Sequence, residues 1–162
     1  MKRIILHWSG GGYSPNGCDL EHYHFLVDKF GKIFKGKFSP QDNKNCNDGK
    51  YAKHTGGLNT GSIGVALCAM FGYKNPKNIG KFPFLRVQAE SAFAYCATLL
   101  KKYDLKPSKQ SVLTHYEVGL MYPNSESAGK QDINFIPYEP EIRPDFVGDY
   151  IREKIRWYYG KQ

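Results

Sequence analysis

The feature that most constrains the fold is the run SIGVALCAMF at residues 62–71. Almost every residue in this run is apolar or small, and polar positions do not alternate with apolar ones. A strand covered on both faces has this pattern, whereas a strand with one solvated face alternates. The run therefore predicts a central strand with other elements packed on each side.

Four further strands are expected around it. Residues 4–8 read as a short apolar strand, which the glycines at positions 10, 11 and 12 bring to an end. Residues 22–28 read as a strand that Phe30 and Gly31 turn into residues 32–35 as a hairpin partner, and residues 111–118 read as another strand. Because the early strands are joined by turns, the sheet is not expected to be purely parallel.

Two helices are expected to cover this sheet. From Leu85 onward, apolar or small residues recur with a period close to 3.6, at Ala89, Ala92, Cys96, Leu99 and Tyr103. A closing amphipathic helix is bracketed by Pro144 and Gly160. Residues 37–60 are polar and predict a long surface loop, and residues 121–140 predict irregular structure. The fold class is therefore α/β (α+β), a single mixed β-sheet with helices packed on its faces.

The length of 162 residues fits one domain, spanning residues 1–162. No segment is long and apolar enough to cross a membrane, and the apolar stretch after Lys2 and Arg3 is too short for a signal peptide. We therefore expect synthesis in the cytoplasm without a signal peptide and no stable membrane insertion. The net charge of +8 favours polyanionic partners, whether nucleic acid, an acidic wall polymer or a membrane surface.

The four cysteines do not form a C-x-x-C pair or a spacing typical of structural zinc. Cys68 and Cys96 fall in apolar segments, which predicts buried free thiols. Cys18 and Cys46 lie in loop-like sequence and could pair only if those loops converge, which the sequence leaves open.

The histidines are the residues most suited to chemistry. A hydrolytic zinc site needs three protein ligands and one open position. Among five histidines, His7 ends the first predicted strand and His115 lies in the middle of the last one. The two could meet if those strands are neighbours, although a lone strand histidine is more often structural. A competing site could use His22 and His24, which are two residues apart.

Five segments, in this order, carry a resemblance to a known family: ILHWSGGG, HYHFLVD, HTGGLNTGSIGVAL, LTHYEVG and GKQD. They resemble the amidase family of bacteriophage lysozymes, bacterial anhydro-muramyl amidases and animal peptidoglycan recognition proteins. The resemblance extends from residue 4 to about residue 137 and is weak in the loop at residues 37–50. It implies an N-acetylmuramoyl-L-alanine amidase, which cuts the amide bond between the lactyl group of the glycan and L-alanine of the stem peptide.

The resemblance also implies a site. The zinc ligands of the family fall on His7, His115 and Asp132, the last of which is Cys in some members, and they would hold one Zn²⁺ per chain. The catalytic residues fall on Tyr23 and Lys130, which would stabilise the oxyanion and deliver a proton to the departing nitrogen. Because Lys130 and Asp132 are two residues apart, an extended chain would point both at the metal pocket.

The remaining predicted site residues border the substrate groove. Trp8, His54, Thr55 and Asn59 are expected substrate contacts, with the alternative that Asn59 only shapes its loop. If Tyr23 lies on a strand and faces the metal, the neighbouring His22 and His24 must face away from it.

The compact length resembles an endolysin of a phage or prophage without a separate wall-binding domain. Such a protein would act on the cell wall in the periplasm, with peptidoglycan as its partner and, we expect, as a monomer. One alternative is a non-catalytic peptidoglycan-binding module of the same fold. Another is a nucleic-acid-binding protein, suggested by the basic closing helix but unsupported by any nucleic-acid motif, so we expect no nucleic-acid partner.

Overall fold

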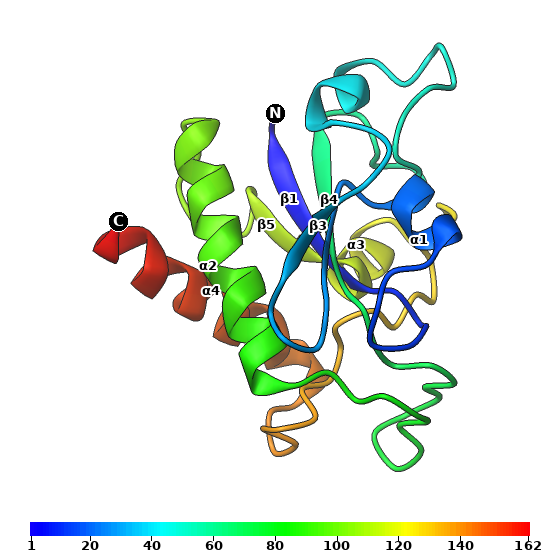
Figure 1. The fold of residues 1–162 in the computed structure, drawn as a ribbon, viewed down its shortest axis with the longest axis vertical. Coiled ribbons are helices and arrows are strands. Elements are labelled where there is room, and N and C mark those ends of the chain that lie inside the picture. The colour runs from blue at the N-terminus through cyan, green and yellow to red at the C-terminus, as the bar shows by residue number, and fades with distance from the viewer.

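The computed structural model describes residues 1–162 and contains one five-stranded sheet in the order β3-β2-β4-β1-β5 (Figure 1). Its strands are β1 (Arg3–Trp8), β2 (Phe25–Val27), β3 (Ile33–Lys35), β4 (Ser62–Leu67) and β5 (Val112–Thr114). β4 lies at the centre, as its unbroken apolar run predicts. All neighbouring strands are parallel except the β2–β3 hairpin, so the predicted mixed sheet is confirmed.

Helices cover both faces of this sheet. The helices are α1 (Gly17–His22), α2 (Arg86–Lys102), α3 (His115–Met121) and α4 (Pro144–Lys161), with a 3-10 turn at Pro40–Lys44. Figure 1 shows α2 and α4 together on one side of the sheet, and the main hydrophobic core lies between them and the strands. The two expected long helices are confirmed, and Pro144 is the first residue of α4. None of the helices is both long and apolar enough to cross a membrane.

Strand alternation decides which side chains reach the opposite face. In β1, Ile4, Leu6 and Trp8 belong to the main core, so Ile5 and His7 point to the other side of the sheet. There Ile5 packs against β5 and against Val118 of α3. His7 is therefore held on the face that the long helices leave open.

The second predicted strand is shorter than expected because a helix precedes it. Asn16 begins α1 by accepting the Asp19 N–H with its side-chain oxygen at 2.9 Å, and Asp19 accepts the Asn16 N–H in return at 3.1 Å. This reciprocal cap satisfies two backbone donors and extends the helix to His22. The prediction of strand at residues 22–24 was wrong.

The last predicted strand also gives way to a helix. β5 ends at Thr114, whose hydroxyl accepts the Glu117 N–H at 3.1 Å, while the Glu117 carboxylate accepts the Thr114 N–H at 3.0 Å. The sequence Thr-x-x-Glu is the signature of such a capping box. His115 is thus the first residue of α3 and does not lie in mid-strand as predicted.

The polar segment at residues 37–60 is tied to the sheet by one buried side chain. Asn43 has no exposed surface and exchanges two hydrogen bonds with the backbone of Ala52, at 2.9 and 3.0 Å. Its carboxamide oxygen also accepts the Nε2–H of buried His24 at 2.9 Å. These bonds fix the loop that carries His54 to the open face of the sheet.

The two cysteines for which the sequence made a definite prediction agree with it. Cys68 and Cys96 are buried and free, as predicted. Cys18 and Cys46, whose pairing the sequence left open, are also free thiols.

We expect Gly64→Ala to lower the free energy of unfolding by about 1–3 kcal/mol, because the added methyl group must displace a packed ring. A Cβ at Gly64 would lie 2.5 Å from Cγ of His54. Urea unfolding followed by circular dichroism measures the change. Gly160→Ala is the matched control, since a Cβ there meets no atom within 4 Å. Equal stability of the two variants would contradict the expectation.

Candidate metal centre

Three donor atoms from distant parts of the chain converge on the open face of the sheet. Nδ1 of His7 lies 3.1 Å from Nδ1 of His115, and each of these atoms lies 3.2 Å from Oδ2 of Asp132. No other group of three histidine, cysteine or acidic side chains comes together in this way. The three residues predicted as ligands are therefore the three that the fold brings together.

The sheet and α3 position these donors. β1 and β5 are parallel neighbours with Leu6 paired to Thr114, so the next residues along each strand are His7 and His115. Asp132 arrives from the segment after α3, and its carbonyl oxygen accepts the backbone N–H of Tyr116 at 3.1 Å. That bond uses one of the free N–H groups at the start of the helix.

Hydrogen bonds on the far side of each imidazole ring set its tautomer. Nε2–H of His115 donates to the hydroxyl of Ser127 at 3.0 Å, and Ser127 donates to the carbonyl of Gly56 at 2.7 Å. Nε2 of His7 lies 3.2 Å from Nδ1 of His54 and 3.3 Å from the hydroxyl of Thr55. Because both Nε2 atoms carry the ring hydrogen and donate it, both Nδ1 atoms are unprotonated. Their lone pairs face the space between the three donor atoms, where a metal ion would bind.

The charge states of the donors suit a cation. Burial lowers the pKa of His7 to about 4, so its ring is neutral at neutral pH. Burial alone would raise the pKa of Asp132, but the close contacts of its carboxylate with the His115 and His7 rings outweigh burial and hold that pKa well below its usual range. A neutral His7 imidazole and an ionised Asp132 carboxylate are the forms in which these two side chains bind a metal.

The spacing of the donors fits zinc. A tetrahedral zinc ion bonded at about 2.0–2.1 Å keeps its ligand atoms about 3.3 Å apart. The three separations of 3.1, 3.2 and 3.2 Å match the edge of such a tetrahedron. Three protein donors also leave the fourth position free, which is the arrangement of hydrolytic zinc sites rather than structural ones.

A cavity of about 260 Å³ opens onto this cluster. Tyr23 and Lys130 both line it, together with His115 and Asp132, so the two predicted catalytic side chains border the same space as the donors. The Tyr23 ring centroid lies 5.1 Å from that of His7. Burial, followed by the nearby charge of Asp132, raises the pKa of Tyr23 far above its ordinary value, so the phenol keeps its proton.

The competing site at His22 and His24 does not form. His22 ends α1 and its Nδ1–H donates to the carbonyl of Cys18 at 2.9 Å. His24 is buried between Asn43 and the backbone N–H of Gly64, which donates to its Nδ1 at 2.9 Å. Neither belongs to the donor cluster, but the predicted strand alternation was wrong. His22 is helical, Tyr23 follows the helix, and both side chains line the cavity beside the donors.

The four predicted substrate contacts separate into two pairs. Trp8 and His54 line the cavity, although both are largely buried and Trp8 packs against the ring of Tyr73. Thr55 has no exposed surface, and Asn59 accepts the Thr55 N–H at 2.8 Å. Neither Thr55 nor Asn59 lines the cavity, and the Asn59 side chain instead holds the backbone of its own loop at Thr55.

Two residues of the site had no signal in the sequence. Ser127 is fully buried and orients His115, but a serine in an irregular segment resembles any turn residue. Lys53 lines the cavity from the long polar segment, where it is one of many lysines. A larger cavity of about 570 Å³ lies between α3 and the start of α4, but its mostly apolar and aromatic lining holds no metal-ligating cluster.

Solved structures show the same fold. The Staphylococcus aureus hydrolase AmiA in complex with its ligand superposes with a TM-score of 0.61 at 20% identity, over 99% of this chain and 75% of that chain. The amidase LysC from Clostridium intestinale URNW gives 0.54 at 17%, over 85% and 80%. The Ph2119 endolysin from a Thermus scotoductus bacteriophage gives 0.53 at 14%, over 91% and 82%. A sequence comparison with curated proteins finds no match.

Comparison of the sequence with protein families finds a family model that matches most of the chain. The family model Amidase_2, described as N-acetylmuramoyl-L-alanine amidase, matches residues 1–132. The match contains all three converging donors as well as Tyr23 and Lys130, and it confirms the resemblance carried by the five sequence segments. Because it spans well over half of the 162 residues, the chain belongs to the N-acetylmuramoyl-L-alanine amidase family and is an enzyme that hydrolyses an amide bond of peptidoglycan.

Proposed function

We propose that this amidase is zinc-dependent and that His7, His115 and Asp132 hold one Zn²⁺ per chain. The observation that carries the proposal is the triangle of donor atoms, with edges of 3.1 to 3.2 Å, beside a cavity that His115 and Asp132 line. A bound zinc ion supplies Lewis-acid chemistry, polarising a carbonyl group and activating water at neutral pH. The bond cut is the amide between the N-acetylmuramoyl lactyl group and L-alanine.

Tyr23 and Lys130 are proposed to handle charge and protons during this reaction. As water adds to the lactyl carbonyl, negative charge develops on the carbonyl oxygen, and the departing L-alanine nitrogen needs a proton. The protonated phenol of Tyr23 donates a hydrogen bond to the developing charge from the wall of the cavity. The ammonium group of Lys130, on the exposed rim, attracts the same charge and is a second proton donor.

The biological setting is proposed from composition and likeness. We propose a phage or prophage endolysin, made in the cytoplasm as a monomeric single domain and acting on peptidoglycan of the cell wall. Its fold is similar to that of a bacteriophage endolysin. The net charge of +8 speeds encounter with a wall polymer whose stem peptides carry carboxylates, and salt should weaken that attraction.

Digestion of purified peptidoglycan tests the proposal. We expect the protein to release new L-alanine amino groups, to lose that activity with a zinc chelator, and to regain it when Zn²⁺ is added. Mass spectrometry of the products should show intact glycan and free stem peptides. Binding to peptidoglycan without release of amino groups would support the non-catalytic binding module instead, and chelator-resistant release would exclude the zinc site.

A further inference from the structure

The N-terminus of α3 holds two of the three donors. His115 is its first residue, and the N–H of Tyr116 binds the carbonyl oxygen of Asp132. His7, in contrast, lies within β1 and is held by the pairing of that strand with β4 and β5. A shift of the start of α3 would therefore move His115 and Asp132 together relative to His7.

The carboxylate of Glu117 caps the N-terminus of α3. Glu117 accepts the Thr114 N–H at 3.0 Å, while its own N–H binds the Thr114 hydroxyl at 3.1 Å. A capping carboxylate on a helix of only seven residues is free to change rotamer unless something else holds it. The stability of the helix start therefore depends on what holds Glu117.

Arg152 of α4 holds the Glu117 carboxylate with both terminal nitrogens of its guanidinium. The guanidinium is only 1% exposed and donates to the two oxygens of Glu117 at 2.9 and 2.8 Å, a planar two-bond pairing. It also donates to the carbonyl of Val112 in β5 at 3.0 Å and to Asp149 at 2.9 Å. The Arg152 side chain thus joins the start of β5 to the cap of α3.

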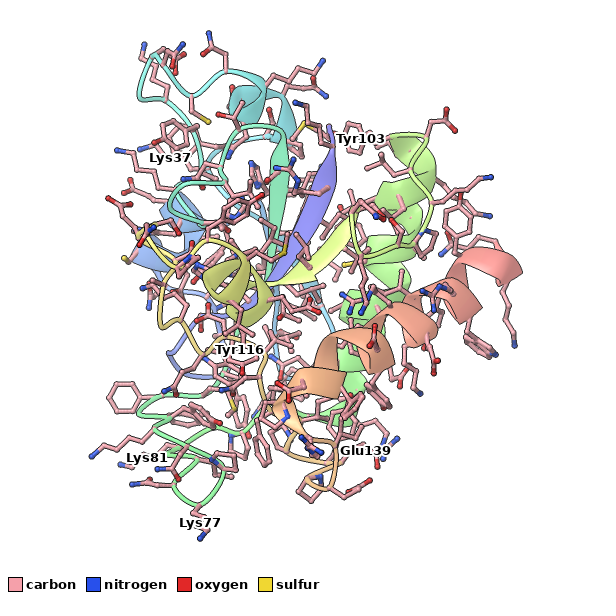
Figure 2. All side chains as sticks on the ribbon, turned by 180° about the vertical axis from the view of Figure 1, so that it is seen from behind. Lys37, Lys77, Lys81, Tyr103, Tyr116 and Glu139 are labelled. Carbon is pink, nitrogen blue, oxygen red and sulfur yellow. The ribbon has the colours of Figure 1, made fainter.

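The backbone of α4 approaches Glu117 closely enough to confine it. Gly148 is buried in α4, and a Cβ at that position would overlap the Glu117 carboxylate, lying 2.5 Å from its Cδ. Tyr116 of α3, which is labelled in Figure 2, lines the same cavity as Pro144 at the start of α4. The Glu117 carboxylate is therefore held between the buried guanidinium of Arg152 and the backbone of α4 at Gly148.

We infer that Arg152, acting through Glu117, is a positioning residue for the metal centre. It fixes the cap of α3 and so sets the distance of His115 and Asp132 from His7. Arg152 lies outside residues 1–132, the part of the chain that the family model matches. The inference rests on the proposed zinc site, because it concerns how tightly that site binds its ion.

Zinc affinity, measured by competition with a chromogenic chelator, tests the inference apart from activity. We expect Arg152→Met to weaken zinc binding about 10- to 100-fold, the range seen when outer-shell partners of metal ligands are removed. Arg152→Lys should fall between wild type and Arg152→Met, since it keeps the charge but loses the planar pairing. Ile155→Val is the matched control, because it alters the packing of the same helix without touching Glu117, and its zinc affinity should stay within about twofold of wild type.

A second variant separates positioning from folding. Gly148→Ala forces the Glu117 carboxylate out of place but keeps Arg152, and the higher helix propensity of alanine in α4 offsets part of the lost pairing, so zinc affinity should fall in a protein that still folds. If Arg152→Met does not fold, Gly148→Ala decides the question alone. Zinc affinity within twofold of wild type in the folded variants would overturn the inference. Absence of zinc binding by the wild-type protein would instead overturn the proposed function.

Discussion

Asp132→Ala should lose zinc and, with it, on the order of 10³-fold or more in kcat/KM on purified peptidoglycan. Asp132 is the only anionic donor of the three, and its oxygen lies 3.2 Å from each imidazole donor. Without it, two neutral nitrogens remain, which is one ligand fewer than a hydrolytic zinc site uses. Zinc content by elemental analysis and release of L-alanine amino groups measure the two effects separately.

Two control variants make this result specific. Asp132→Cys should keep zinc, because a thiolate is also a zinc ligand, and should therefore retain more activity than Asp132→Ala. Asp48→Ala removes an acid of equal charge from an exposed position in the long polar segment and should change neither zinc content nor turnover. An Asp132→Ala protein that keeps both its zinc and wild-type turnover would eliminate the proposed ligand set.

Local pattern was enough to predict most of the fold. The unbroken apolar run placed β4 at the centre of the sheet, and the 3.6-residue period located α2. The errors came where a capping box follows or precedes a strand, at Asn16 and at Thr114. At Thr114, reciprocal side-chain and backbone bonds begin a helix within residues predicted as strand, and at Asn16 such bonds begin a helix whose last residue, His22, was predicted to start a strand. The Thr-x-x-Glu signal was present in the sequence and could have located the start of α3.

The site was predictable only where resemblance supplied it. Neither His7 nor Asp132 carries a local signal of metal binding, because the two are 125 positions apart in the sequence and meet only when the chain has folded. The residues that support the donors are harder still to predict from the sequence. Ser127 orients His115, and Arg152 holds the cap of its helix, but each acts through contacts that no sequence period encodes. Packing of α4 against the start of α3 is a tertiary property, visible only in the structure.

Lys130→Met should lower kcat by about 10²–10³-fold while leaving zinc content unchanged, because it removes a charged donor from the site of developing charge without removing a ligand. Lys130 lines the cavity beside Asp132 but does not belong to the donor cluster. The matched control is Lys53→Met, which removes the same charge from the same cavity. The Lys53 ammonium lies over the Tyr51 ring, 5.6 Å from its centroid, so its loss should raise KM a few-fold through weaker attraction of the wall polymer and leave kcat intact.

The contrast between the two lysines distinguishes a chemical role from a general electrostatic one. If Lys130 acted only through the basic charge of the surface, both variants would show the same change in KM, and added salt would reduce the difference between each variant and wild type. A role in the reaction predicts a fall in kcat for Lys130→Met that persists at high salt, since a short-range contact with the reacting group is poorly screened. Steady-state kinetics on soluble muropeptides at two ionic strengths would separate these outcomes, and equal kcat values for the two variants would remove Lys130 from the reaction.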